Sequence, residues 1–99
     1  MPYRLDISPD AESHLIPLRK FDQTRIVNAM ETQLTHEPLK PSRNRTPMRS
    51  NLIATWELRV ANFRVYYDVN EPEQMVLIRA IGIKQHGSVS IGGEEVDLS

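Results

Sequence analysis

Residues 56–69 read WELRVANFRVYYDV, and this stretch decides the fold. Apolar and polar side chains alternate on both sides of Ala61-Asn62, which is the pattern of two half-buried β-strands joined by a tight turn. Asparagine tolerates the positive φ that a two-residue hairpin turn needs, although alanine does not help. Because successive side chains of a strand point to opposite faces, the hairpin has an apolar face and a polar face. The apolar face carries Trp56, Leu58, Val60, Phe63, Val65 and Tyr67.

The polar face of this predicted hairpin carries Glu57, Arg59, Arg64 and Tyr66. A turn at residues 61–62 places Arg59 directly opposite Arg64, and like charges in that position destabilise a strand pair. An anion between the two guanidinium groups would remove the repulsion, and arginine binds phosphate well. We therefore interpret the polar face as an anion site. The alternative interpretation is a solvated charge network of Glu57 with both arginines.

Helix signals precede the hairpin. Residues 3–7 alternate like a strand, and Ser8-Pro9 then marks a helix start, with serine as the N-cap and proline in the first helical position. Pro17 should kink or end that helix near Ile16. A second helix is expected from about residue 22 to residue 35, where an apolar stripe recurs every four residues. The stripe consists of Ile26, Met30 and Leu34.

Residues 36–52 break all periodicity and contain several prolines, which predicts a long loop. Loops of this length in a small domain are usually functional or disordered. Residues 38–66 carry a net charge of +5, against −2 for residues 1–37 and −4 for residues 67–99, so the total of −1 hides a basic patch. Such a patch attracts a polyanion, although a solvated arginine-rich loop has the same composition. The candidate RNA-binding residues of the loop are Lys40, Arg43, Arg45 and Arg49.

Strands are expected at residues 53–60, 63–69 and 75–81, and a short strand can follow at residues 89–91. The run at 75–81 is nearly all apolar, which suits a strand buried on both faces, but it contains Arg79. That side chain must either find a carboxylate or reach the working face. The order β-α-α-β-β-β(-β) predicts a single α+β domain over residues 1–99, with the helical hairpin packed on one face of a small, mostly antiparallel sheet.

Composition removes several classes of protein. A chain of 99 residues, of which 25% are charged, has room for one soluble domain. It has no cysteine, which excludes disulfides and thiolate metal sites, and its histidines lack metal-ligand spacing, so no metal or other cofactor is expected. No apolar run approaches the ~20 residues of a membrane span, and the N-terminus lacks the apolar core of a signal peptide. We expect a cytoplasmic protein, with His14 on a helix surface.

The two halves of the hairpin, Trp56-Glu57-Leu58-Arg59-Val60 and residues 63–69, together resemble the central hairpin of the RelE/ParE toxin superfamily. The resemblance extends to Ala80-Ile81-Gly82 with Lys84 and His86, and to the Gly92-Gly93-Glu94-Glu95 segment. It implies the toxin half of a bacterial toxin–antitoxin pair, with a cognate antitoxin protein as partner. RelE-like members cut mRNA, generally on the ribosome and without a metal, by using the RNA 2′-hydroxyl as nucleophile. ParE-like members share the fold but poison DNA gyrase.

The resemblance also implies roles for individual residues. Arg64 matches an arginine that contacts the scissile phosphate in RelE-like nucleases, and Arg59 matches a basic position on the preceding strand. Lys84 falls where these enzymes often carry a basic residue, and His86 lies near a position that holds a catalytic histidine in some relatives. Glu57 stands where the best-known RelE nuclease has a lysine, although other relatives use a nearby glutamate as general base.

Ser90 falls about where a stacking or catalytic tyrosine is common in the superfamily, so Tyr66 is the candidate for stacking on an RNA base. These departures leave three functions open at this point. The first is a RelE-like endoribonuclease, the second is a ParE-type gyrase poison without nuclease activity, and the third is a degenerate member that only binds its antitoxin.

Overall fold

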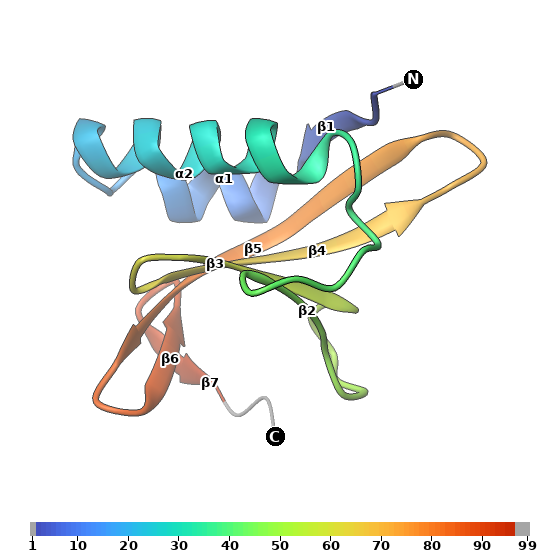
Figure 1. Cartoon of the computed structure of the whole chain (residues 1–99). Helices are drawn as coiled ribbons and strands as arrows, with labels where there is room; N and C mark the ends of the chain where they lie inside the picture. Colours follow the sequence, from blue (N-terminus) through green and yellow to red (C-terminus); the bar gives the residue numbers. More distant parts are fainter. Residues whose placement is uncertain (1, 97–99) are drawn as a thin grey trace.

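The computed structural model describes residues 2–96, and across them two helices and seven strands follow one another. Figure 1 shows the helices side by side over one face of a curved sheet, while β6, β7 and the segment around β2 bend away on the other side. The elements are β1 (Arg4–Ile7), α1 (Pro9–Leu15), α2 (Lys20–Leu34), β2 (Arg45–Pro47), β3 (Trp56–Val60), β4 (Phe63–Asn70), β5 (Met75–Gln85), β6 (Ser88–Ile91) and β7 (Glu94–Val96).

The sheet is antiparallel along the path β2-β3-β4-β5-β6-β7, and β1 joins it by pairing with β5 in parallel. β5 therefore has two partners on its second edge: β1 along its first half and β6 along its second half. The long β5 strand makes this division possible because each partner spans only four residues. The predicted α+β fold, with a helical hairpin on one face of a mostly antiparallel sheet, is confirmed.

The hairpin of β3 and β4 has the predicted register, with Arg59 opposite Arg64 and Val60 opposite Phe63. The turn differs in one respect. Ala61 takes the left-handed conformation, with φ of 54°, and the neighbouring Asn62 does not. The positive φ was expected at the asparagine. Because it falls on the alanine instead, the alternation of side chains, and not the preference of the turn residue, explains this register.

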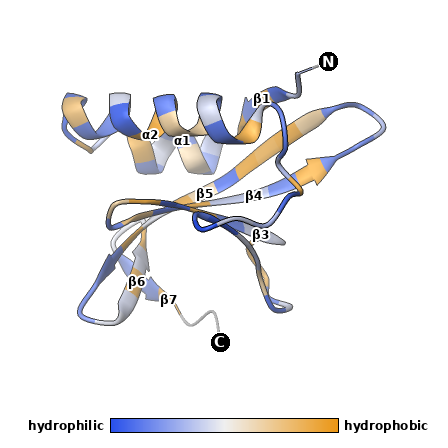
Figure 2. Cartoon of the chain, in the orientation of Figure 1, coloured by the Kyte–Doolittle hydropathy of each residue, from blue (hydrophilic) through white to orange (hydrophobic). Residues whose placement is uncertain are grey.

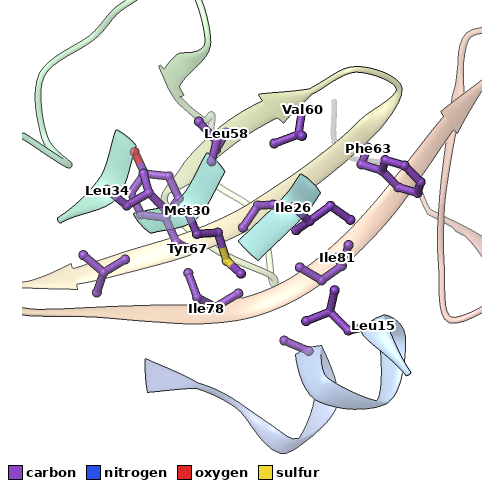
Figure 3. Close-up of a cluster of buried hydrophobic side chains, with 13 residues drawn as sticks. Leu15, Ile26, Met30, Leu34, Leu58, Val60, Phe63, Tyr67, Ile78 and Ile81 are labelled. Carbon is purple, nitrogen blue, oxygen red and sulfur yellow. The ribbon is translucent and has the colours of Figure 1, made fainter. Parts of the chain in front are cut away.

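The core lies between the helices and the sheet face beneath them (Figure 3). Ile26, Met30 and Leu34, the predicted stripe of α2, are fully buried there. Tyr67 stacks on Trp56 with ring centroids 6.1 Å apart, and its hydroxyl donates to the Pro38 carbonyl at 2.7 Å. Figure 2 shows apolar residues recurring along β5, which runs beneath the helices. From the sheet the core receives Leu58, Val60, Phe63, Val65, Tyr67, Val76, Ile78 and Ile81.

The helix boundaries follow from their local signals. The Ser8 hydroxyl accepts a hydrogen bond from the Ala11 N–H at 3.1 Å, which is the predicted N-cap. α1 then ends at Leu15, and Pro17 prevents its continuation. α2 begins at Lys20, two residues earlier than predicted, and the Gln23 amide donates back to the Leu18 carbonyl in the connection between the helices.

Residues 51–55 are a loop and not the start of β3, which begins at Trp56. The reason is the Asn51 side chain. Its carbonyl oxygen accepts from the N–H groups of Ile53 and Ala54 at 2.7 and 3.0 Å, and its amide donates to the Ala54 carbonyl at 3.0 Å. These local bonds compete with strand pairing. β2 and β7 were not predicted, because three residues are too few to show alternation.

The prediction that residues 75–81 are buried on both faces is wrong. Burial alternates along the first half of β5, where Val76 and Ile78 are buried and Leu77 is half-buried. Tyr66 then pairs with Ala80, while Tyr67 pairs with Ile78, which leaves Arg79 as an extra residue on β5. This two-against-one arrangement is a β-bulge, and it lets Ile78 and Ile81 both pack in the core while Arg79 stays on the outward side.

Candidate functional site

The face of the sheet opposite the helices, called the far face below, carries the polar side chains of the β3–β4 hairpin. Glu57 and Arg64 form an ion pair there, with 3.5 Å between Oε1 and Nε. Arg64 is only 7% exposed, and its Nη1 donates to the carbonyls of Ala61 and Phe63 at 3.0 and 2.9 Å. The guanidinium therefore braces the hairpin turn and holds the Glu57 carboxylate.

This geometry corrects the expectation of an open anion site between two exposed arginines. Glu57 and the turn carbonyls supply the negative charge that offsets the repulsion between Arg59 and Arg64. The network is not a solvated one either, because Arg64 is buried. Arg59 is exposed, so it is the guanidinium of this pair that an external anion reaches first.

Tyr66 was expected on a solvent-facing surface, and that expectation is wrong. Its side chain is fully buried in a second apolar cluster on the far face, because the loop after β2 and strand β6 fold over it. Burial, and next the negative charge of Glu57, raise the pKa of Tyr66 to about 12. Its hydroxyl has no hydrogen-bond partner among residues 2–96. The cluster consists of Tyr66, Ala54, Ala80, Met48, Ile53, Val89 and Ile91.

Lys84 and His86 both lie at the hairpin-tip end of β5 and are exposed. The Lys84 N–H donates to the Asn62 carbonyl at 2.7 Å, which places this residue beside the β3–β4 turn. Lys84 follows Gly82, the partner of Arg64, by two residues, so strand alternation puts it on the far face. His86 sits in the β5–β6 turn, with φ of 52°, beyond the last paired residue.

The basic loop divides into anchored and free side chains. The Arg45 guanidinium donates from Nε to the Lys40 carbonyl and from Nη1 to the Gln33 carbonyl of α2, both at 2.9 Å. Arg45 therefore fastens the loop to the helices, which the sequence pattern did not reveal. Lys40 is exposed and lies 3.4 Å from the Glu37 carboxylate. Arg43 and Arg49 are exposed to solvent.

A family model, that of the ParE toxin of the type II toxin–antitoxin system parDE, matches residues 5–86. The chain belongs to this family. The match confirms the resemblance to the RelE/ParE superfamily and makes the protein a toxin of a type II toxin–antitoxin system. No curated protein sequence matches this ParE-family toxin.

Two solved structures share the fold of the ParE-family toxin. A chain of the toxin–antitoxin complex RelBE2 from Mycobacterium tuberculosis is 24% identical, with a TM-score of 0.74, over 85% of this toxin and 93% of that chain. A chain of the archaeal RelE–RelB complex from Pyrococcus horikoshii OT3 is 20% identical, with a TM-score of 0.69, over 87% of this toxin and 99% of that chain. At these identities the likeness establishes the fold.

The sequence predicted His14 on a helix surface and left two alternatives open for Arg79. His14 is half-buried and not on a free helix surface, because its Nδ1 accepts from the Ile81 N–H at 3.2 Å. Arg79 satisfies both alternatives left open for it: its Nε lies 3.7 Å from Asp68 Oδ2, and half of its side chain is exposed. Alternation along β5 places Arg79 on the same side as Leu77, opposite the buried Val76 and Ile78, which explains how a residue in an apolar run reaches solvent.

Within residues 2–96 of the toxin, no three of the histidines, aspartates and glutamates gather as the ligands of a metal ion. In the same residues, neither helix has the length and apolar character needed to cross a membrane. Around the β3–β4 turn the far face carries one carboxylate with exposed and buried cations: Glu57, Arg59, Arg64 and Lys84.

Proposed function

We propose that this ParE-family toxin is a metal-independent endoribonuclease that cuts mRNA on the ribosome and thereby inhibits translation. The observation that supports this function best is the meeting of Glu57, Arg59 and Arg64 on the far face of β3 and β4. Cleavage of RNA through its own 2′-hydroxyl needs a base, an acid and positive charge beside the reacting phosphate. The groups that would supply these are Glu57, Arg59, Arg64 and Lys84 of the far face, with His86 of the adjoining β5–β6 turn.

In the proposed reaction, the Glu57 carboxylate takes the proton of the 2′-hydroxyl, whose oxygen attacks the adjacent phosphorus. Arg64 holds Glu57 by their ion pair, so it acts as a positioning residue. The exposed Arg59 binds the phosphate, and Lys84 stabilises the negative charge of the phosphorane. The bond from phosphorus to the 5′-oxygen then breaks, and His86 donates the proton that this oxygen takes up. The products are a 2′,3′-cyclic phosphate and a 5′-hydroxyl end.

The test uses primer extension on cellular mRNA after induction of the toxin without antitoxin. Wild-type toxin should create new 5′ ends within coding regions, and Arg59→Gln should reduce them roughly 100-fold, the usual effect of removing one group that stabilises the transition state. Arg25→Gln is the matched control, because Arg25 is also exposed but lies on α2, across the core. Arg59 is a better target than Arg64, since truncating a buried, hydrogen-bonded arginine also destabilises the fold.

Unchanged cleavage by Arg59→Gln at equal expression would show that Arg59 is not part of the site. Absence of new 5′ ends after induction of the wild-type toxin would reject the nuclease function. Glu57→Gln keeps the size of the side chain and abolishes the proposed base. Purified toxin with this change, added to mRNA on ribosomes, should lose cleavage by about 100-fold or more while its thermal unfolding stays cooperative.

A gyrase poison is the second candidate, and specific observations favour it. The matching family model is that of the ParE toxin, and the Arg64 guanidinium is already engaged by Glu57 and the turn carbonyls. Purified toxin added to gyrase and plasmid DNA separates the candidates: inhibited supercoiling without RNA cuts favours the poison. Harmless expression without antitoxin would instead indicate a degenerate, antitoxin-binding member.

We also propose that a cognate antitoxin binds this toxin in a hetero-oligomer. The support is that the structural relatives from M. tuberculosis and P. horikoshii were crystallised in toxin–antitoxin complexes. Co-expression with the product of a neighbouring antitoxin gene should restore growth, and the two proteins should elute together in size-exclusion chromatography. Growth arrest that persists despite equal expression of that partner would reject it as the antitoxin.

A further inference from the structure

Arg79 occupies an irregular position in the sheet. It is the extra residue of the bulge in β5, the longest strand among residues 2–96. The bulge lets Ile78 and Ile81 both pack in the core, while Arg79 between them stays on the outward side. β-bulges are common beside active sites, so an arginine at the bulge is a candidate for a functional role.

The Asp68 carboxylate contacts both Arg79 and the neighbouring loop. Its Oδ2 lies 3.7 Å from Arg79 Nε, and its Oδ1 accepts from the N–H and the hydroxyl of Thr55 at 2.8 and 2.7 Å. Both carboxylate oxygens are thus engaged. Because Asp68 approaches the Nε side of the guanidinium, the two terminal nitrogens remain available to a second anion. Half of the Arg79 side chain is exposed, which gives such an anion access.

A second arginine faces the same space from the loop. A hollow of about 280 Å³ lies between residues 48–55 and the sheet, and both Arg49 and Arg79 line it. The loop wall is ordered, since the Asn51 side chain bonds to the backbone of residues 49, 53 and 54. Asp68 is the carboxylate in this hollow, so the lining has a net charge of +1. A phosphate group carries the matching charge, and paired arginines bind its oxygens well.

We propose that Arg49 and Arg79 form a phosphate-binding site for the backbone of a bound RNA strand, separate from the proposed cleavage site. The inference rests on the proposed nuclease function for the identity of the ligand. Asp68 follows Arg64 by four residues along β4, which corresponds to about 13 Å. A phosphate held by Arg79 is therefore a different phosphate from the one that is cut, and it fixes the direction and register of the strand.

The experiment measures binding of a short, fluorescently labelled RNA whose 2′-hydroxyls are methylated, which removes the nucleophile and keeps the ribose backbone. Dissociation constants are compared from about 50 to about 200 mM salt. Arg79→Gln and Arg49→Gln should each weaken binding about 5- to 10-fold and lower the slope of log Kd against log salt by about 0.7, the value for one lost phosphate contact on a single strand. Arg25→Gln, the exposed control on α2, should change neither quantity.

Arg79→Lys keeps the charge and should keep the slope, so it distinguishes phosphate binding from a packing role of the bulge. An unchanged slope in Arg79→Gln, with wild-type binding intact, overturns the inference and leaves the nuclease standing. A lowered slope in a toxin that never cuts RNA overturns the nuclease and leaves the binding site standing. A wild-type toxin that binds no free RNA overturns the inference, while primer extension on cellular mRNA decides the nuclease separately.

Discussion

Replacing Tyr66 by phenylalanine tests the far face most directly, because the structure gives a matched comparison next to it. Tyr66 and Tyr67 are neighbours on β4, and both are fully buried. The Tyr67 hydroxyl donates to the Pro38 carbonyl at 2.7 Å, whereas the Tyr66 hydroxyl has no partner among residues 2–96. The same chemical change, loss of one phenolic oxygen, should therefore have opposite effects at adjacent positions.

The magnitude follows from the desolvation of the hydroxyl. A buried polar group without a hydrogen bond costs about 1–3 kcal/mol, so Tyr66→Phe should raise the free energy of unfolding by about 1 kcal/mol after the small loss of packing. Tyr67→Phe removes a formed bond and leaves the Pro38 carbonyl unpaired, so it should lower that free energy by about 1 kcal/mol.

Urea unfolding followed by tryptophan fluorescence measures both variants, since Trp56 stacks on Tyr67 within the core. With an m-value of about 1 kcal/mol/M for a domain of this size, the midpoints should lie about 2 M apart, with Tyr66→Phe the higher. Equal losses of stability in the two variants would refute the reasoning. That result would mean that the Tyr66 hydroxyl makes a hydrogen bond in solution, for example to a buried water.

The remaining predictions concern pH, packing and capping. Because burial raises the pKa of Tyr66 to about 12, the unfolded chain, with its ordinary value of 10.0, loses the phenolic proton first as the pH rises. This difference in pKa therefore leaves the free energy of unfolding unchanged below pH 10 and should lower it by about 1.4 kcal/mol per pH unit between pH 10 and 12. Urea midpoints measured across that range should show this decline, and Tyr66→Phe should diminish it. Gly82→Ala should destabilise the toxin by about 1–3 kcal/mol in thermal unfolding, because the added methyl would stand 2.9 Å from Val89 Cγ1; an unchanged midpoint would show that β6 gives way freely. Ser8→Ala removes the α1 cap and should lower the unfolding free energy by about 1 kcal/mol, whereas Ser13→Ala, a matched exposed serine within the helix, should have less effect.

Most of the local structure was predictable from the chain alone. Alternation in residues 56–69 gave the register of the hairpin, including the opposition of Arg59 and Arg64. Ser8 and Pro17 gave the limits of α1, and the four-residue stripe gave the buried side of α2. Each of these signals operates within a few residues of the chain, where backbone geometry leaves few alternatives. The resemblance of the hairpin to RelE/ParE toxins followed from the same residues, and the family match confirms it.

The candidate site was only partly predictable, because alternation states which side chains share a face and not what covers that face. At Tyr66 the far face is closed over by Ile53 of the loop and Val89 of β6, from segments more than ten and twenty residues away along the chain. That closure moved Tyr66 from a proposed RNA contact into an apolar cluster. Separately, the burial of Arg64 against Glu57 and the turn carbonyls left Arg59 as the accessible cation of the pair.

By itself, the sequence determined the helices and the hairpin, since these depend on periodicity and on caps, and the resemblance of the hairpin residues indicated the family. The tertiary structure decided which charges are free: Arg45 fastens a loop to α2, Arg64 holds Glu57, and Arg79 pairs with Asp68 while half of its side chain stays exposed. The physical reason is that the free energy of an arginine depends on its solvent exposure and its partners, and both are set by contacts between residues far apart in the chain.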